Sequence, residues 1–298
     1  MEPEIEDLYQ ILGLGAVGSL IALILNSNRK RVLLFDSKNE LSRVKHIRAK
    51  GKLSEIFGKE IIFNSSNLLD ASSCSTLIIS KKYSDRYCKE VAQIIGTVSP
   101  EANVLLVQNG YGHIRDLREL LPNNLIIGMF SGLEIFWDAG ELVLRQYPSN
   151  LHIPDSEAEF TNQLTADLAS PLLRIQNGGS ESEVIWNKLA RWIPLSVITA
   201  VTRLPCGEAL EIFPRPLLNL LIRETCNLAQ TELGGIYDES EILGQLYNLP
   251  KRLTTSSMRD SLKGVRTELW YVLKDMETDL AKHDLSNSAV KQVMDLLD

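Results

Sequence analysis

The chain of 298 residues is long enough for two domains, because a single hydrophobic core usually stops growing at about 250–300 residues. Its content of 44% hydrophobic and 23% charged residues is ordinary for a globular protein. The formal net charge of −7 argues against a nucleic-acid partner, since binding phosphates requires an excess of lysine and arginine.

Short apolar runs alternate with helical stretches in the first half of the chain, which is the pattern of a parallel sheet flanked by helices. The predicted strands are 8–12, 31–35, 61–63, 76–80, 104–107 and 125–129, and the predicted helices are 16–25, 38–49, 84–95 and 114–121. Residues 141–145 and 151–153 are expected to pair as an antiparallel hairpin at the sheet edge.

Helical periodicity dominates from about residue 156 onward. The predicted helices are 157–168, 182–199, 216–233, 240–246 and 257–282, with no strand between them. We therefore predict a Rossmann-type, doubly wound α/β domain over residues 1–174 and an all-helical domain over 175–298. Asn177-Gly178-Gly179 is a plausible hinge between them.

Several classes of site have no support in the sequence. The four cysteines form no CxxC pair and the four histidines no metal-ligand spacing, so we predict no metal and a reducing, cytoplasmic location. The acidic first residues are unlike a secretory signal, and the longest apolar run near them, 20–25, is too short to span a membrane.

A GxGxxG turn lies directly between the first predicted strand and the following helix. Gly13 permits the tight turn, Gly15 lets the backbone approach a pyrophosphate, and Gly18 allows the helix to pack closely on the strand. With Ala16 and Val17, these residues present the free N–H groups of a helix N-terminus to phosphates. The turn therefore predicts a dinucleotide site.

An acidic residue, Asp36, ends the second predicted strand about 18 residues after Gly18. Its carboxylate can accept a hydrogen bond from the adenosine ribose, which favours NAD(H), and would repel the 2′-phosphate of NADP(H). However, Ser37 and Lys38 follow at once, and Lys38 could hold that phosphate while Asp36 turns away. The choice of cofactor stays open at this point.

The helical half supplies candidates for chemistry. Lys188 borders an apolar helix face made by Ile185, Leu189, Trp192 and Ile193. By default such a lysine is a surface residue, but in a cleft it could polarise a carbonyl and deliver a proton. Glu268 is by default a solvated glutamate on a long helix expected to bury Met258, Leu262, Val265, Leu269, Val272 and Met276. Ser257, with Asp260, fits a capping box and is a candidate helix N-cap.

These segments together resemble the ketopantoate reductase (2-dehydropantoate 2-reductase) family over nearly the whole chain. The matches occur in the family's order: the glycine turn at 13–18, Lys81, Gln108-Asn109-Gly110, Trp186-x-Lys188-Leu189, Cys206-Gly207-Glu208-Ala209-Leu210, Glu224, Ser256-Ser257-Met258 and Thr267-Glu268-Leu269.

The resemblance implies a Rossmann-type domain, a helical C-terminal half like that of 6-phosphogluconate dehydrogenase, and NADP(H)-dependent reduction of ketopantoate to pantoate in pantothenate biosynthesis. The family's catalytic lysine falls on Lys188, its conserved glutamate on Glu268, and its carboxylate-binding serine on Ser257. Asn109 would lie beside the nicotinamide and substrate, with Lys81 lining the same cleft. A homodimer is expected by analogy alone.

The departures from the family pattern concern the substrate side. Trp192 and Ser196 stand where two asparagines are usual, so Ser196 is the remaining candidate polar contact there. Trp270 replaces an acid, Arg259 a glutamine, and Ser37 an arginine that meets the NADP phosphate. A smaller, more apolar pocket keeps two alternatives open: a reductase for a different, more apolar substrate, and a non-catalytic or regulatory dinucleotide-binding protein on the same fold.

Overall fold

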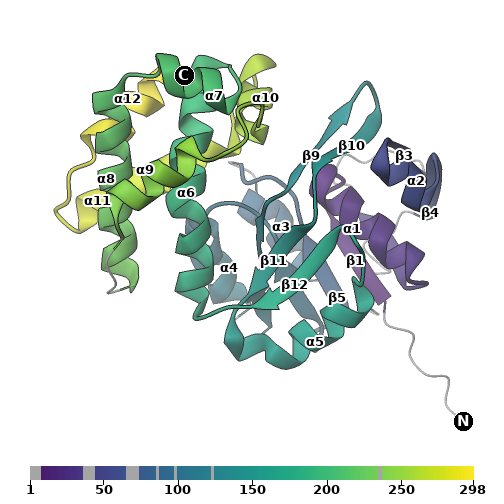
Figure 1. The fold of residues 1–298 in the computed structure, drawn as a ribbon. Helices are drawn as coiled ribbons and strands as arrows, with labels where there is room; N and C mark the ends of the chain where they lie inside the picture. Colours follow the sequence, from purple (N-terminus) through teal and green to yellow (C-terminus); the bar gives the residue numbers. More distant parts are fainter. Residues whose placement is uncertain are drawn as a thin grey trace, which may run out of the picture. The chain divides into compact units, whose positions relative to one another are not determined.

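The computed structural model divides the chain into two compact units. The first comprises residues up to 108 together with 113–184, and the second comprises 109–112 together with 185–298. The structure describes residues 8–35, 44–64, 74–84, 87–96, 99–121, 124–233 and 237–298. Figure 1 shows the strands in the first of these units and the helices from α6 to α12 toward the C-terminus.

A five-stranded parallel sheet forms the centre of the first unit. Its order is β2 (Arg31–Phe35), β1 (Leu8–Leu12), β5 (Thr76–Ile79), β6 (Asn103–Leu106) and β7 (Leu125–Ile127). The middle strands are continuous runs of buried, mostly apolar residues, as a sheet covered on both faces requires. The predicted doubly wound α/β fold is confirmed, and the parallel strands all end at one sheet edge.

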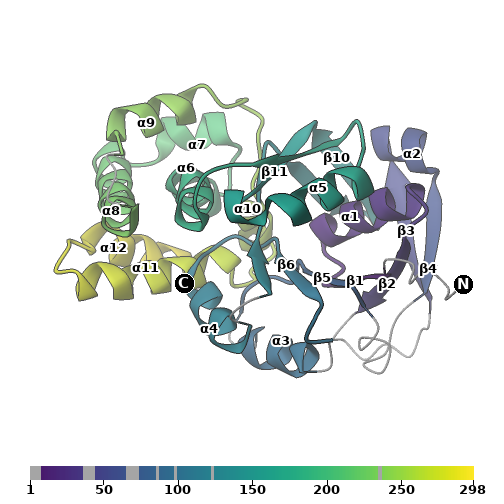
Figure 2. The same ribbon diagram turned by 90° about the horizontal axis from the view of Figure 1, so that it is seen from below.

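Helices cover both faces of this sheet. Figure 2 shows α1 (Ala16–Ser27) and α5 (Ala158–Asp167) on one side, and α3 (Tyr87–Ile95) and α4 (Gly112–Leu120) on the other. All residues of α1 from Gly18 to Leu25 are buried, which explains why this helix is apolar all round rather than amphipathic.

Two smaller sheets extend the first unit. One has the order β4 (Glu60–Asn64), β3 (Val44–Lys50), β10 (Glu141–Gln146) and β9 (Glu134–Asp138), with α2 (Lys52–Phe57) between β3 and β4. The other has the order β12 (Leu173–Asn177), β11 (Ser149–Ile153) and β8 (Met129–Ser131), and the short 3₁₀ helix η2 (Asp155–Glu157) precedes α5.

These small sheets overturn three predictions. The predicted helix 38–49 is wrong over its described part, because 44–49 belong to β3, where Ile47 and Ala49 point inward and alternate with exposed side chains. The run 61–63 pairs antiparallel with β3 instead of joining the parallel sheet. The predicted hairpin is also wrong: β10 pairs with β9 and β3, whereas β11 pairs with β8 and β12. The strand β12 was not expected.

The described part of the second unit is helical. It contains most of α6 (Glu181–Thr202), α7 (Cys206–Ile212), α8 (Arg215–Leu233), α9 (Glu239–Tyr247), α10 (Ser256–Leu262), α11 (Glu268–Lys282) and α12 (Ser288–Leu297). Helix α8 packs against α9, α11 and α12. Among the described helices, none is both long enough and apolar enough to cross a membrane.

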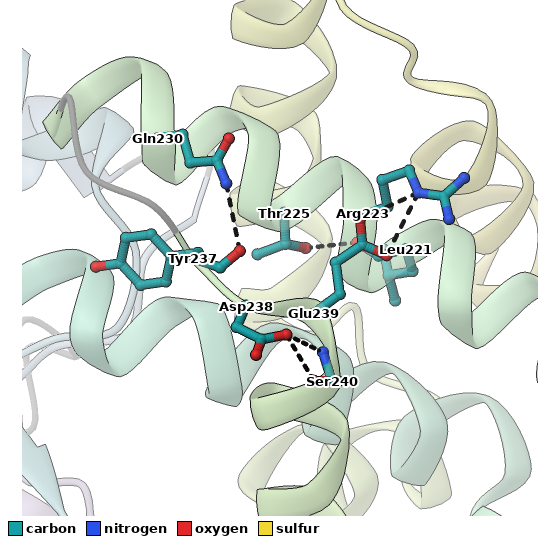
Figure 3. Close-up of polar contacts among 8 residues, drawn as sticks. All are labelled: Leu221, Arg223, Thr225, Gln230, Tyr237, Asp238, Glu239 and Ser240. Carbon is teal, nitrogen blue, oxygen red and sulfur yellow. Dashed lines mark hydrogen bonds and ion pairs between the residues drawn. The ribbon is translucent and has the colours of Figure 1, made fainter.

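Polar contacts join α8 to α9 and to the two residues that directly precede α9 (Figure 3). The Gln230 side-chain amide donates to the Tyr237 carbonyl over 3.3 Å, and the Asp238 carboxylate caps α9 by accepting from the Ser240 amide over 2.8 Å. Arg223 of α8 forms an ion pair with Glu239 at 3.1 Å. These contacts cap the N-terminus of α9 and link its first residue to α8.

The predicted helix 257–282 is two helices, α10 and α11, separated by a turn in which Gly264 has a φ of +65°. Leu262 and Val265, expected in the core, are 56% and 57% exposed because the apolar stripe stops at this turn. Each helix has a threonine N-cap: Thr255 accepts from the Met258 amide and Thr267 from the Trp270 amide. The expectation that Ser257 is the cap is therefore wrong by two residues.

Candidate active site

The glycine turn of the first unit follows β1 at the sheet edge where the parallel strands end. Gly13 has a φ of +101°, and a Cβ atom there would lie 2.5 Å from the backbone nitrogen of Lys81. The Ser80 hydroxyl donates to the Gly13 carbonyl over 2.7 Å. A Cβ on Gly18 would overlap the Gly13 carbonyl and the Ser80 side chain. Gly13 and Gly18 are thus required by close backbone packing.

Gly15 differs from its two neighbours in the motif, because a Cβ there would meet no atom within 4 Å. Gly15 is the N-cap of α1, no side chain caps this helix end, and its first turn, which includes Ala16 and Val17, has no acidic residue. The N-terminus of α1 therefore offers unoccupied backbone donors and the positive end of the helix dipole, which fits a phosphate group. The other predicted cofactor residues Asp36, Ser37 and Lys38 lie outside the described residues.

Replacing Gly15 with valine is expected to leave the fold intact and to weaken binding of NADH and NADPH at least about tenfold, because the side chain would occupy the space in front of the α1 N-terminus. Isothermal calorimetry and the thermal unfolding midpoint test this directly. Gly18→Val is the matched control, expected to lower the unfolding midpoint strongly because its Cβ has no room. Unchanged dinucleotide affinity in Gly15→Val would contradict the assignment of the turn.

Lys188 lies on α6 in the second unit and is half-buried, not a surface residue. Among the described residues, no side chain or backbone group forms a hydrogen bond or ion pair with its ammonium group. Burial lowers the pKa of Lys188 to about 8; the nearby Arg191 lowers it further, while Glu268 opposes the shift. A lysine in this state can be both a cation and a proton donor near neutral pH.

Glu268 is the first residue of α11 and is 7% exposed, so the default expectation of a solvated glutamate is wrong. Its Oε2 accepts a hydrogen bond from the Asn109 Nδ2 over 3.1 Å. Asn109 belongs to the short segment 109–112 that is part of the second unit. The fold thus gathers Lys188, Glu268 and Asn109, three of the predicted site residues, into one electrostatic group.

Ser257 and Ser196 are buried on α10 and α6, but among the described residues neither forms a hydrogen bond with Lys188 or Glu268. The two helices are joined by Thr199 and Thr255, whose hydroxyls are 2.7 Å apart. The Ser196 Oγ is buried without a hydrogen-bond partner. An unpaired buried hydroxyl is costly in an ordinary core, which makes Ser196 a candidate for contact with a ligand.

The two tryptophans expected to alter the site have different surroundings. Trp192, one turn after Lys188 on α6, is buried. Trp270 is partly buried on α11, with the Arg266 guanidinium 4.3 Å from its ring centroid, and its Nε1 has no hydrogen-bond partner. Neither ring can accept a hydrogen bond as an asparagine or an acid does.

Sequence reasoning missed two residues of these sites, Ser80 and Thr255. Both are small hydroxyl residues whose bonding depends on the fold, although a threonine two residues before a predicted helix start is a recognisable cap signal. No group of three or more metal-ligating side chains occurs among the described residues.

Comparisons with protein-family models and with solved structures agree with each other. A family model described as ketopantoate reductase PanE/ApbA matches residues 9–158, about half of the chain. Comparison with curated proteins finds no match.

Solved structures resemble the chain over almost its full length. The dimeric ketopantoate reductase from Staphylococcus aureus has a TM-score of 0.78 at 20% identity, and a PanE/ApbA family ketopantoate reductase from Ralstonia eutropha has 0.81 at 17%. A D-mandelate dehydrogenase with NADH and anilino(oxo)acetate has 0.80 at 18%. In each pair 97% of both chains is covered, so the fold is shared throughout.

Proposed function

The chain belongs to the ketopantoate reductase family of NAD(P)-dependent oxidoreductases, and on that premise we propose that it reduces a 2-oxo acid to the 2-hydroxy acid, with ketopantoate as first substrate. The observation that carries the proposal is Lys188, a half-buried lysine near Glu268 whose ammonium group has no hydrogen-bond or ion-pair partner among the residues that the structure describes. Such a group is expected to bind a carbonyl oxygen that gains negative charge during the reaction.

The proposed mechanism assigns one task to each residue of the group. When bound, the reduced nicotinamide supplies a hydride to C2 of the substrate. Lys188 Nζ polarises the 2-oxo group and gives its proton to the oxygen as the carbonyl becomes a hydroxyl. Glu268, held by Asn109 at 3.1 Å, accepts a hydrogen bond from a substrate hydroxyl, and Ser257 donates one to the substrate carboxylate.

The cofactor is proposed to bind through its pyrophosphate at the N-terminus of α1, with Gly13, Gly15 and Gly18 shaping the turn and Lys81 beside it. We propose NADP(H) as first choice from the family, with NAD(H) as the alternative. The D-mandelate dehydrogenase structure of the same fold contains NADH, which supports keeping NAD(H) as the alternative.

The decisive test is turnover of a panel of 2-oxo acids with NADPH and with NADH, followed by loss of reduced-nicotinamide absorbance. We expect oxidation of the cofactor with ketopantoate and formation of pantoate, detected by mass spectrometry. Absence of turnover with every 2-oxo acid, combined with tight dinucleotide binding, would instead support the non-catalytic dinucleotide-binding alternative.

A second candidate function is reduction of a different, more apolar 2-oxo acid. Buried Trp192 and partly buried Trp270 favour it, because they stand at positions where an amide and an acid are usual in the family. The D-mandelate dehydrogenase acts within the same fold on an aromatic compound, according to its name. A higher kcat/KM for phenylglyoxylate than for ketopantoate would select this candidate.

We also propose a homodimer, in analogy with the dimeric Staphylococcus aureus relative, and a cytoplasmic location. The described cysteines Cys74, Cys206 and Cys226 are free and buried, which supports a reducing compartment.

A further inference from the structure

The segment 109–112 includes Asn109, which donates a hydrogen bond to Glu268, and it makes further contacts with helices of the second unit. The Tyr111 ring lies 5.0 Å from the Trp186 ring, two residues before Lys188 on α6. Gly112 lies against the Asp275 carboxyl group on α11, where a Cβ would overlap it. Three of these four residues therefore contact α6 or α11, the helices that carry the proposed catalytic pair.

The two residues that flank this segment belong to the first unit and share one partner there, Tyr87 of α3. On the N-terminal flank, the Tyr87 hydroxyl donates a hydrogen bond to the Gln108 Oε1. On the C-terminal flank, the His113 ring packs edge-to-face on the Tyr87 ring, with centroids 5.4 Å apart. Tyr83 packs on His113 at 4.7 Å and completes the cluster.

The cluster is a packing site, not an acid–base site. Tyr87 and His113 have no exposed surface, and Gln108 is almost fully buried. Burial lowers the pKa of His113 to about 3, so its imidazole is neutral throughout the physiological range. The neutral His113 ring therefore holds the start of α4 in place by packing alone.

We propose that Tyr87 is a positioning residue, which fixes both ends of the segment 109–112 and thereby places the Asn109 amide against Glu268. Gly110, with a φ of +104°, has no side chain to restrain the backbone next to Asn109, so the anchored flank at Gln108 contributes to the placement of the Asn109 amide. This inference rests on the proposed function for its kinetic effect, but the placement of Asn109 can be measured without turnover.

The variant Tyr87→Phe removes the hydroxyl and keeps the ring. We expect kcat to fall about tenfold with little change in the KM for the cofactor, because a small displacement of an aligned group is enough to slow the chemical step. In an Asn109→Ala background the same change is expected to alter kcat less than about twofold, since Tyr87 acts through Asn109. Independent, multiplicative effects of the two substitutions would overturn the proposal.

Tyr9→Phe is the matched control. Tyr9 is a fully buried tyrosine of the same unit, on β1, and its hydroxyl donates to Asp167. Both variants lose a buried hydroxyl hydrogen bond and are expected to lower the unfolding midpoint. Only Tyr87→Phe is expected to lower kcat while the KM for the cofactor stays nearly unchanged.

An activity-independent measurement separates this inference from the proposed function. In NMR spectra of protein labelled with ¹⁵N-asparagine, the side-chain amide signal of Asn109 is the one that disappears in Asn109→Ala. The chemical shift of this signal is expected to change in Glu268→Gln and in Tyr87→Phe, but not in Tyr9→Phe. An unchanged Asn109 signal in Tyr87→Phe would overturn the positioning role, whatever the turnover assays give.

Discussion

Replacing Lys188 with methionine is expected to lower kcat by about 10²- to 10⁴-fold and to raise the thermal unfolding midpoint at the same time. The loss of rate follows from removal of the proposed proton donor. The gain in stability follows because a half-buried lysine, whose ammonium group has no partner within the described part of the chain, is replaced by an apolar side chain of similar length. Steady-state kinetics and thermal unfolding of the purified variant measure the two effects, and affinity for NADPH and NADH should stay nearly unchanged.

The pH dependence of the wild-type protein tests the same assignment. The pKa of Lys188 lies at about 8, below its ordinary value of 10.5, so kcat/KM for the reduction is expected to fall tenfold per pH unit above about pH 8. For stability the sign is opposite: the unfolded chain binds this proton more strongly, so the charged lysine destabilises the fold below about pH 8. This penalty disappears as the pH rises from 8 through 10.5.

Lys274→Met is the matched control for Lys188→Met. Lys274 is an exposed lysine on α11 that pairs with Glu277 at 2.9 Å, and its replacement is expected to change stability by less than about 0.5 kcal/mol. A kcat within tenfold of wild type in Lys188→Met would remove the lysine from the proposed mechanism. A lower unfolding midpoint in that variant would contradict the account of its burial.

Replacing Glu224 with alanine is expected to destabilise the second unit by about 3 kcal/mol or more. Glu224 lies on α8 and is 2% exposed, yet its carboxylate caps the N-terminus of α12. It accepts from the Ala289 and Val290 amides at 3.1 and 3.0 Å and from the Ser286 and Ser288 hydroxyls at 2.7 and 3.2 Å. Its removal leaves the two buried amides of Ala289 and Val290 without their acceptor and takes a negative charge from a helix N-terminus. The exposed hydroxyls of Ser286 and Ser288, 3.3 Å apart, lose a shared acceptor.

Equilibrium unfolding in urea measures this loss, and Asn287→Ala is its control. Asn287 is the N-cap residue of α12 by position, but its side chain makes no capping hydrogen bond and donates instead to the Glu277 carbonyl over 3.3 Å. Its replacement is therefore expected to cost only about 1 kcal/mol. Glu224→Gln keeps one acceptor oxygen but loses the negative charge, so its loss of unfolding free energy is expected to lie between those of Glu224→Ala and Asn287→Ala. A loss below about 1 kcal/mol in Glu224→Ala would contradict the capping role.

Local patterns in the sequence predicted several elements nearly to the residue. Strands β1 and β2 and the start of α1 agree with the predicted 8–12, 31–35 and 16, because continuous apolar runs and the glycine turn between them are strong local signals. The buried face of α6 around Lys188 was likewise predicted from helical periodicity, since Ile185, Leu189, Trp192 and Ile193 are all buried.

The tertiary structure alone decided which elements pair and which side chains are partners. β10 and β11 are separated by only two residues, but β10 forms its hairpin with the preceding strand β9, whereas β11 pairs with β8 and β12. The sequence alone did not show which neighbouring strand is the hairpin partner. The strand β3 forms because its partners β4 and β10 supply hydrogen bonds that no local propensity encodes.

The sequence by itself determined the dinucleotide turn, the family and the identity of the candidate residues. The tertiary structure decided what surrounds them, as Glu268 and Asn109 show, because these two residues are 159 positions apart and become hydrogen-bonded partners only in the fold. Glu224 meets the N-terminus of α12 across more than 60 residues in the same way. Burial, capping and pKa depend on such long-range contacts, and a linear pattern carries no record of them.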